Sequence, residues 1–122
     1  MSGAVMAGGS LTGFFWLTQR AIAEMATRYG GHVVSVLATL GEVADPGMPA
    51  VLAALTAATG SLAIEYAAYG IRVNAISPGR AGQVSDVVDG VLLLESSPGI
   101  TGKILRIDGT PNGQATSRGT AG

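Results

Sequence analysis

The sequence predicts an α/β fold in which about three parallel strands are joined by crossover helices. Along its 122 residues, stretches with helical periodicity alternate with short apolar runs, and this alternation is typical of a parallel sheet covered by helices. Hydrophobic residues make up 48% of the chain and charged residues 12%, a balance that favours a buried core over disorder. The length suits one small domain.

A first helix is predicted over residues 11–28 and a strand over 32–37. Apolar residues recur every three or four positions in the helix, Ser10 precedes it as an N-cap, and Gly30-Gly31 ends it. The run that follows is almost continuously apolar, which suits a strand buried on both faces. Residues 1–10 are small and glycine-rich, and we expect a flexible N-terminal arm there.

The second helix is predicted over residues 50–68, after a loop over 41–49 that contains Asp45-Pro46-Gly47. Gly70 ends this helix, and a buried strand over 71–76 follows it.

The third helix is predicted over 86–95, with Ser85 as its N-cap and Asp86 in its first turn. Residues 103–107 alternate apolar and charged side chains, which predicts a last strand at a sheet edge. The domain therefore covers residues 11–109, and the polar, glycine-rich tail over 110–122 is expected to be disordered.

Composition excludes several classes of function. The net charge is −1 without any run of basic residues, so no nucleic-acid or anionic-membrane partner is expected. The absence of cysteine removes disulfides and thiolate chemistry. No apolar run approaches the roughly 18 residues of a membrane span, and the start lacks the basic region of a signal peptide. We therefore expect a cytoplasmic protein.

One stretch carries most of the information, the ten residues from Gly70 to Gly79, which read GIRVNAISPG. Together with the residues at 11–19, 31–35 and 100–109, and in the same order, it resembles the C-terminal half of short-chain dehydrogenases/reductases. The resemblance implies a partial Rossmann-like three-layer fold and an oxidoreductase that uses NAD or NADP. It also implies that Pro78 and Gly79 contact the cofactor near its nicotinamide.

The catalytic residues of that family are missing from the matching positions. The family's asparagine and serine fall at Ser10 and Ala38. The tyrosine falls at Val51 or Met48, depending on the direction of counting, and the lysine falls at Leu52. In the family the tyrosine exchanges a proton with the substrate and the lysine lowers its pKa. We therefore assign no catalytic residue.

The phosphate-binding loop of the family is also not found. Gly3, Gly8 and Gly9 precede a helix, but no strand is predicted before them, and such a loop needs one. The stretch from Gly79 to Gln83 is too short for the family's substrate lid. These losses predict a truncated, catalytically inactive member.

The remaining candidates have simpler structural interpretations. His32, the only histidine, is expected to be a solvated residue at the start of a strand. Glu65 is expected on a salt-linked helix face and Tyr66 in the core. The aromatic residues 14–16 are expected in helix packing, within the chain or across an oligomer interface. No spacing of acidic residues predicts a metal site.

Two alternatives stay open. The chain is either a non-catalytic interaction subunit, forming homo- or hetero-oligomers through the helices at 11–28 and 50–68, or one half of a split or mispredicted reductase. The interaction hypothesis predicts that Phe15→Asp or Leu62→Asp dissociates the assembly.

Overall fold

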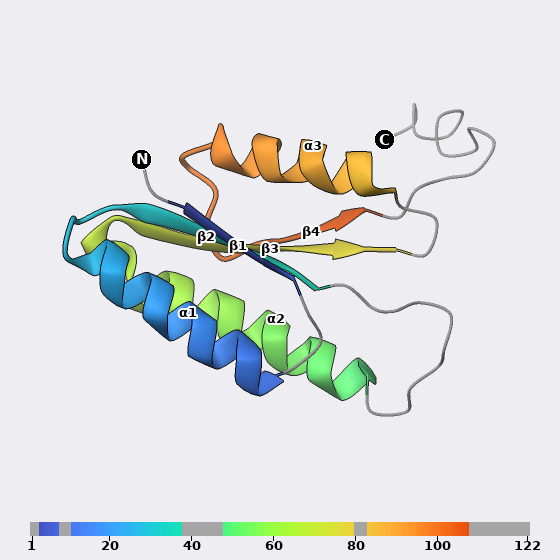
Figure 1. Ribbon diagram of the computed structural model, residues 1–122, viewed down its shortest axis with the longest axis horizontal. Helices are drawn as coiled ribbons and strands as arrows, with labels where there is room; N and C mark the ends of the chain where they lie inside the picture. Colours follow the sequence, from blue (N-terminus) through green and yellow to red (C-terminus); the bar gives the residue numbers. More distant parts are fainter. Residues whose placement is uncertain (1–2, 8–10, 38–47, 80–82, 108–122) are drawn as a thin grey trace.

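The computed structural model describes residues 3–7, 11–37, 48–79 and 83–107, which form a single parallel sheet flanked by helices (Figure 1). The four strands lie in the order β1-β2-β3-β4, and each strand pairs in parallel with the next. The elements are β1 (Gly3–Ala7), α1 (Leu11–Ala26), β2 (Gly31–Val36), α2 (Met48–Glu65), η1 (Ala67–Tyr69), β3 (Ile71–Pro78), α3 (Val84–Glu95) and β4 (Ile104–Ile107). The predicted α/β class is confirmed, and β4 lies at an edge as predicted.

The sheet has one strand more than the sequence predicts. Residues 3–7 form β1, which pairs with β2 from Gly3 opposite His32 to Ala7 opposite Val36, where a flexible arm was expected over 1–10. Glycine and alanine have weak strand propensity, so this strand depends on pairing with β2 and gives no local signal. The predicted tail at 110–122 and the predicted cap Ser10 lie outside the described residues.

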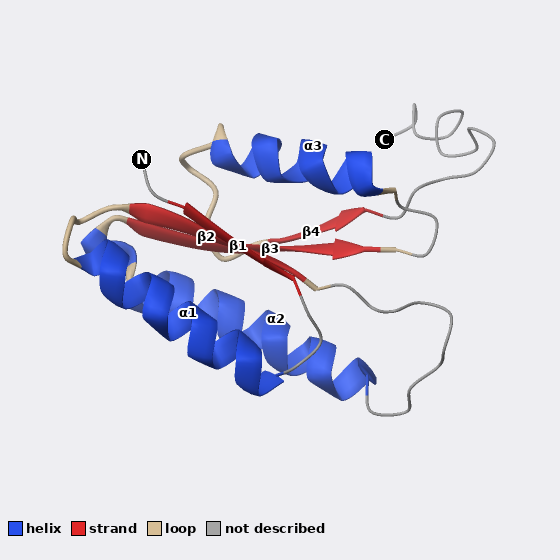
Figure 2. Ribbon diagram, in the orientation of Figure 1, coloured by secondary structure: helices blue, strands red, loops and turns tan. Residues whose placement is uncertain are grey.

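The helices form two layers on opposite faces of the sheet (Figure 2). Helices α1 and α2 cover one face, and their core side chains pack against alternate strand residues. Helix α3 covers the other face through Leu94, which packs with Val34 and Ile76. Because side chains alternate across a strand, neighbouring residues of β2 and β3 contribute to different layers.

The last crossover has the opposite hand to the first two. The strands follow one another across the sheet in sequence order, yet α1 and α2 lie on one face and α3 lies on the other. Parallel crossovers are right-handed in about 98% of cases. With β1-α1-β2 and β2-α2-β3 following that rule, β3-α3-β4 is a left-handed connection.

The helix ends differ from the predicted ends by a few residues, for identifiable reasons. Helix α2 ends at Glu65 and a short 3-10 turn continues to Tyr69, where Gly70 adopts a left-handed conformation with φ 71°. Helix α3 begins at Val84, and its N-cap is Gln83 rather than the predicted Ser85. The Gln83 side chain and the Asp86 carboxylate form a reciprocal capping box.

Candidate functional site

The carboxyl ends of the strands are the place to look for a site, because ligands of parallel α/β sheets bind there. Strands β2, β3 and β4 end at this edge, and α2 begins beside it. The edge contains a cleft of about 260 Å³ between α2 and β4. Its lining residues are Leu37, Leu52, Thr56, Ser77, Ile104 and Arg106.

This cleft is chemically quiet. Leu52 is half-buried and packs against a core cluster that contains Phe14, Leu37 and Leu55. The hydroxyl of Thr56 donates a hydrogen bond of 2.8 Å to the Leu52 carbonyl oxygen. The six lining residues include no carboxylate, imidazole or phenol, so the lining offers no group that exchanges a proton near neutral pH.

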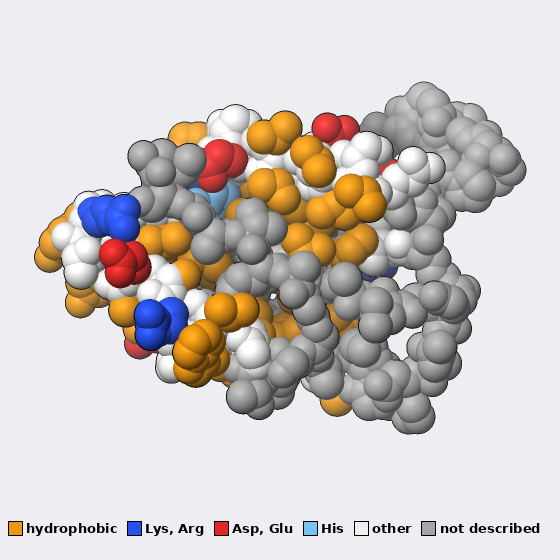
Figure 3. Space-filling model, viewed as in Figure 1, with side chains coloured by type: hydrophobic (Ala, Val, Ile, Leu, Met, Phe, Trp, Pro, Cys, Tyr) orange, Lys and Arg blue, Asp and Glu red, His pale blue; other side chains and the backbone are white. Residues whose placement is uncertain are grey.

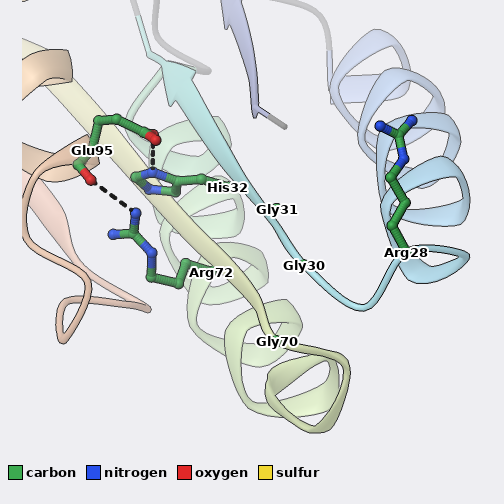
Figure 4. A pocket seen from close by; sticks show the side chains of 7 residues that line it. All are labelled: Arg28, Gly30, Gly31, His32, Gly70, Arg72 and Glu95. Carbon is green, nitrogen blue, oxygen red and sulfur yellow. Dashed lines mark hydrogen bonds and ion pairs between the residues drawn. The ribbon is translucent and has the colours of Figure 1, made fainter. Parts of the chain in front are cut away.

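The opposite, amino edge of the sheet is polar (Figure 4). A cavity of about 350 Å³ lies there, lined by Arg28, Gly30, Gly31, His32, Gly70, Arg72 and Glu95. The sequence predicts a solvated His32, and this prediction is wrong, because only 2% of the residue is exposed. Its ring lies on the α3 side of β2, where the end of α3 covers it and Glu95 provides a partner.

Hydrogen bonds define the protonation state of His32. Its Nδ1 lies 2.9 Å from Glu95 Oε1, and its Nε2 lies 2.9 Å from the amide nitrogen of Asn74. The Asn74 amide oxygen accepts the Lys103 N–H at 3.0 Å, so the amide nitrogen must face the ring and the Ile100 carbonyl oxygen. Nε2 therefore accepts, and the proton of the neutral ring is on Nδ1.

Burial of the ring lowers the pKa of His32 below its ordinary value of 6.5. The hydrogen bond to Glu95 opposes this shift, and the positive charge of Arg72 reinforces it. The imidazole is consequently neutral at pH 7, in agreement with the acceptor role of Nε2.

Arg72 closes the carboxyl end of α3. Its guanidinium donates to the carbonyl oxygens of Leu94 at 2.8 Å, Glu95 at 3.1 Å, Ser97 at 3.0 Å and Ile100 at 3.4 Å. The last carbonyls of a helix have no partner inside it and carry partial negative charge. Arg72 provides both the hydrogen bonds and the positive charge, so this one of the two arginines that line the cavity serves the fold.

The comparisons with known proteins begin with a family model described as enoyl-(acyl carrier protein) reductase, which matches residues 5–81, more than half of the chain. The chain belongs to the short-chain dehydrogenase/reductase family. It is 43% identical to the oxidoreductase UcpA of Escherichia coli K12 over 74 residues, which cover 57% of this chain and 28% of UcpA. It is 31% identical to carbonyl reductase family member 4 of Danio rerio over 118 residues, covering 76% of this chain and 50% of that protein.

Solved structures show the same fold. Acetoin dehydrogenase YohF from Salmonella typhimurium superposes with a TM-score of 0.78 at 21% identity, covering 89% of this chain and 63% of that one. A short-chain dehydrogenase from Leptospira borgpetersenii, solved with bound NAD+, gives a TM-score of 0.77 at 24% identity, with coverages of 88% and 63%. This short-chain dehydrogenase/reductase chain spans half or less of the length of the two curated relatives.

Within this family member, the positions predicted from the resemblance fall at the carboxyl edge. Met48, Val51 and Leu52 all lie at the start of α2, and Ala38 lies outside the described residues. Helix α2 contains neither a tyrosine nor a lysine.

The two predicted cofactor contacts also lie at this edge. Pro78 ends β3 opposite Ile107, and the Gly79 N–H donates to the Ile107 carbonyl oxygen at 2.5 Å. The Gly79 N–H is thus used in the sheet, and proline has none. These two residues offer a nicotinamide only carbonyl oxygens and apolar surface.

The start of α3 does not fit the phosphates of NAD or NADP. The N-terminus of α3 is occupied by its own capping box, whose Asp86 carboxylate repels an anion. The strand that the sequence prediction missed does precede Gly8 and Gly9, but these glycines lie outside the described part.

The remaining candidates have structural places. Glu65 is exposed, Tyr66 packs against the core cluster, and Phe14 is buried. Phe15 and Trp16 are 40% and 60% exposed. Among the described residues, no group of acidic or histidine side chains can hold a metal ion, and no helix is long and apolar enough to cross a membrane.

Sequence reasoning missed Arg72, Asn74 and Glu95. A signal was present, since Arg72 and Asn74 are polar residues two apart within the otherwise apolar run over residues 71–76. That spacing places both on one face of β3, the face that α3 covers.

Proposed function

We propose that this chain is a non-catalytic member of the short-chain dehydrogenase/reductase family that acts by associating with another protein subunit. One observation supports the loss of chemistry: Leu52, at the lysine position, packs into the apolar cluster with Leu37 and Leu55. Position 52 thus lacks the ammonium group of a lysine, and the tyrosine position four residues earlier is occupied by Met48. Without the phenol and ammonium pair, the site cannot transfer a proton to a carbonyl oxygen.

The composition of α2 supports the association. Its 18 residues contain a single charged side chain, Glu65, at the last position. The residues that α2 exposes are otherwise uncharged and mostly small, namely Ala50, Ala53, Ala54, Thr56, Ala57, Ser61 and Ile64. A helix that is apolar on all sides is typically buried, so a partner surface is expected over α2.

Helix α1 extends this surface. Phe15, Trp16 and Leu17 are 40%, 60% and 44% exposed, and Figure 3 shows large apolar side chains on the α1 side of the molecule. A groove of about 440 Å³ between α1 and α2 is lined by Ile22, Ala23, Ala26, Leu62, Tyr66, Tyr69, Gln19 and Glu65. Exposed aromatic residues beside a groove whose lining carries one charged side chain, Glu65, are typical of an interface core.

The loss of activity is tested by following NADPH and NADH oxidation with a panel of ketones and enoyl thioesters. The chain is expected to show no rate above buffer, and calorimetry is expected to show no cofactor binding. The double variant Met48→Tyr/Leu52→Lys, which restores the tyrosine–lysine spacing, serves as the comparison. Reduction of any substrate by the unaltered chain would disprove the proposal.

The association is tested by native mass spectrometry of Ile64→Asp, whose parent side chain is 82% exposed on α2. This variant is expected to fold and to dissociate, because a carboxylate would be buried in the contact. Leu62 is one of the two residues that the sequence suggests for this test, the other being Phe15. It packs against two core clusters, one with Ile22 and one with Leu37, so its substitution would unfold the chain instead. Val84→Asp, at an 80% exposed position on α3, is expected to leave the assembly intact. Dissociation by Val84→Asp alone would place the contact on α3 and contradict the proposal.

A second candidate is one half of a two-chain reductase. Strand β1 is an edge strand of a parallel sheet, and an edge strand presents backbone groups that can pair with a strand of another polypeptide. Mixing the chain with the N-terminal half of UcpA tests it. Binding of NADPH by the mixture, and by neither part alone, would favour this candidate over the first.

A further inference from the structure

We propose that His32 is a proton-operated latch. The neutral imidazole holds the connection from α3 to β4, residues 96–103, against the sheet, and protonation of Nε2 releases it. This inference is independent of the proposed association, because the latch lies at the amino edge and on the α3 face.

The latch is built so that only the neutral ring fits. His32 is 2% exposed and lies between the Glu95 carboxylate on α3 and the Asn74 amide on β3. Nδ1–H donates to Glu95, and Nε2 accepts from the Asn74 NH2 group. The same amide donates to the Ile100 carbonyl oxygen and accepts the Lys103 N–H, so its orientation is set from both sides.

Protonation puts two donors face to face. A proton taken from solvent on Nε2 would point at the Asn74 NH2 group, which has no lone pair to accept it. Turning the amide over would bring its oxygen to Nε2–H, but it would then point NH2 at the Lys103 N–H and remove the acceptor from that backbone group. Either way, at least one buried hydrogen bond is lost.

The bonds at risk hold the whole connection. Besides the Asn74 contacts, the Val73 N–H donates to Thr101 Oγ1 at 3.0 Å, and the Gly102 N–H donates to the Val73 carbonyl oxygen at 2.7 Å. The Ala75 N–H donates to the Lys103 carbonyl oxygen at 2.9 Å. These bonds surround the Asn74 side chain, so displacing the amide loosens residues 100–103 together.

Charged groups from each neighbouring element bear on the ring. Glu95 at the end of α3 favours the imidazolium, while Arg72 on β3 opposes it. Arg28, after the end of α1, lines the same cavity and is paired with Glu24 at 3.3 Å. Burial is the largest influence and lowers the pKa of His32 below 6.5.

The direction of the pH effect follows from that shift. A histidine whose folded-state pKa is depressed contributes stability above its unfolded pKa of 6.5 and loses it as the pH falls through the lower folded pKa. The connection is therefore closed at neutral pH, and the free energy that keeps it closed decreases as the pH falls below 6.5.

The chain's single histidine makes the test direct. Long-range proton–nitrogen NMR spectra of the folded chain are expected to show the Nδ1–H tautomer at neutral pH. Amide exchange at residues 100–103, corrected for intrinsic rates, is expected to become about tenfold faster for each unit by which the pH is lowered while the ring titrates. Amides in the first half of α2 provide the internal control and are expected to stay protected.

Asn74→Asp is the matched variant. Its carboxylate loses the donation to the Ile100 carbonyl oxygen, but it still accepts the Lys103 N–H and also accepts Nε2–H of the imidazolium. Opening is therefore expected to move to a pH at least about one unit lower. In the unaltered chain, an Nε2–H tautomer at neutral pH would overturn the proposal. Titration of His32 without any change in amide exchange at residues 100–103 would also overturn it. So would identical pH dependence in Asn74→Asp and the unaltered chain.

Discussion

The two edges of the sheet contrast in what holds them together. The amino edge has a connected set of hydrogen bonds between β2, β3 and α3. They are formed by His32, Asn74, Arg72 and Glu95. At the carboxyl edge, where ligands of parallel α/β sheets bind, the cleft is bounded by Leu37, Leu52 and Ile104. Polar side chains with demanding geometry are thus concentrated at the edge where no reaction is expected.

This difference separates the requirements of the fold from those of catalysis. The left-handed connection to β4 does not follow from the natural twist of the strands, so it has to be fastened by specific side chains, and the amino edge supplies them. The carboxyl edge needs only to be filled, and leucine fills it. Substitutions at the amino edge are therefore expected to lower the stability of the chain more than substitutions at the carboxyl edge.

The largest effect is expected for Asn74→Leu. The substitution leaves the Lys103 N–H and the Ile100 carbonyl oxygen without their partner, at a cost of about 3 kcal/mol in the free energy of unfolding. Urea denaturation measures it, with Thr27→Val, at an exposed site, as a control expected to change stability by less than about 0.5 kcal/mol. A loss below about 1 kcal/mol would remove the contrast between the edges.

Arg72→Lys is expected to cost about 2 kcal/mol, because an ammonium cannot reach the four carbonyl oxygens that the guanidinium fork spans. Arg20→Lys on the exposed side of α1 is the control and should be nearly neutral. Equal stability of the two variants in thermal unfolding would show that charge alone, rather than the fork, closes α3.

Gly70→Ala is expected to cost about 1–2 kcal/mol, since Gly70 has φ 71° and an added Cβ would lie 3.0 Å from the Tyr29 carbonyl oxygen. Gly60→Ala is the matched control in α2, where an added Cβ has nothing within 4 Å. That change is expected to stabilise the chain by about 0.5–1 kcal/mol. The two variants should therefore shift the thermal midpoint in opposite directions.

The smallest effect is expected at the carboxyl edge itself. Leu52→Met conserves volume in a half-buried apolar site and should change stability by less than about 1.5 kcal/mol. Circular dichroism during urea unfolding measures it. A larger loss would mean that the cleft requires the branched leucine shape, and that the carboxyl edge is as specified as the amino edge.

The sequence predicted most of the fold because its signals were local. The apolar run from His32 to Leu37, the glycine before β3 and the helical periodicities each reflect residues close together in the chain. Strand β1 escaped prediction because Gly3 and Ala7 adopt an extended form only through pairing with β2. The partner of His32 escaped because Glu95 is 63 residues away in sequence.

The candidate site shows the same division between features with local sequence signals and features that depend on distant residues. The predicted order of strand and turn put Pro78 and Gly79 after the strand at 71–76, and the structure ends β3 at Pro78, because the motif and the strand end coincide in sequence. That order said nothing of the Gly79 N–H bond to β4, which depends on the register of two strands.

The left-handed connection has a consequence for how the chain acquires its structure during synthesis. Strands β1 to β3 can pair in the order in which they emerge from the ribosome, each step closing a crossover of the usual hand. The α3–β4 segment forms hydrogen bonds with His32, Arg72 and Asn74 on β2 and β3, so we expect it to dock after these residues are in place. We therefore expect it to join last, as a separate kinetic step whose rate depends on the protonation of a single imidazole.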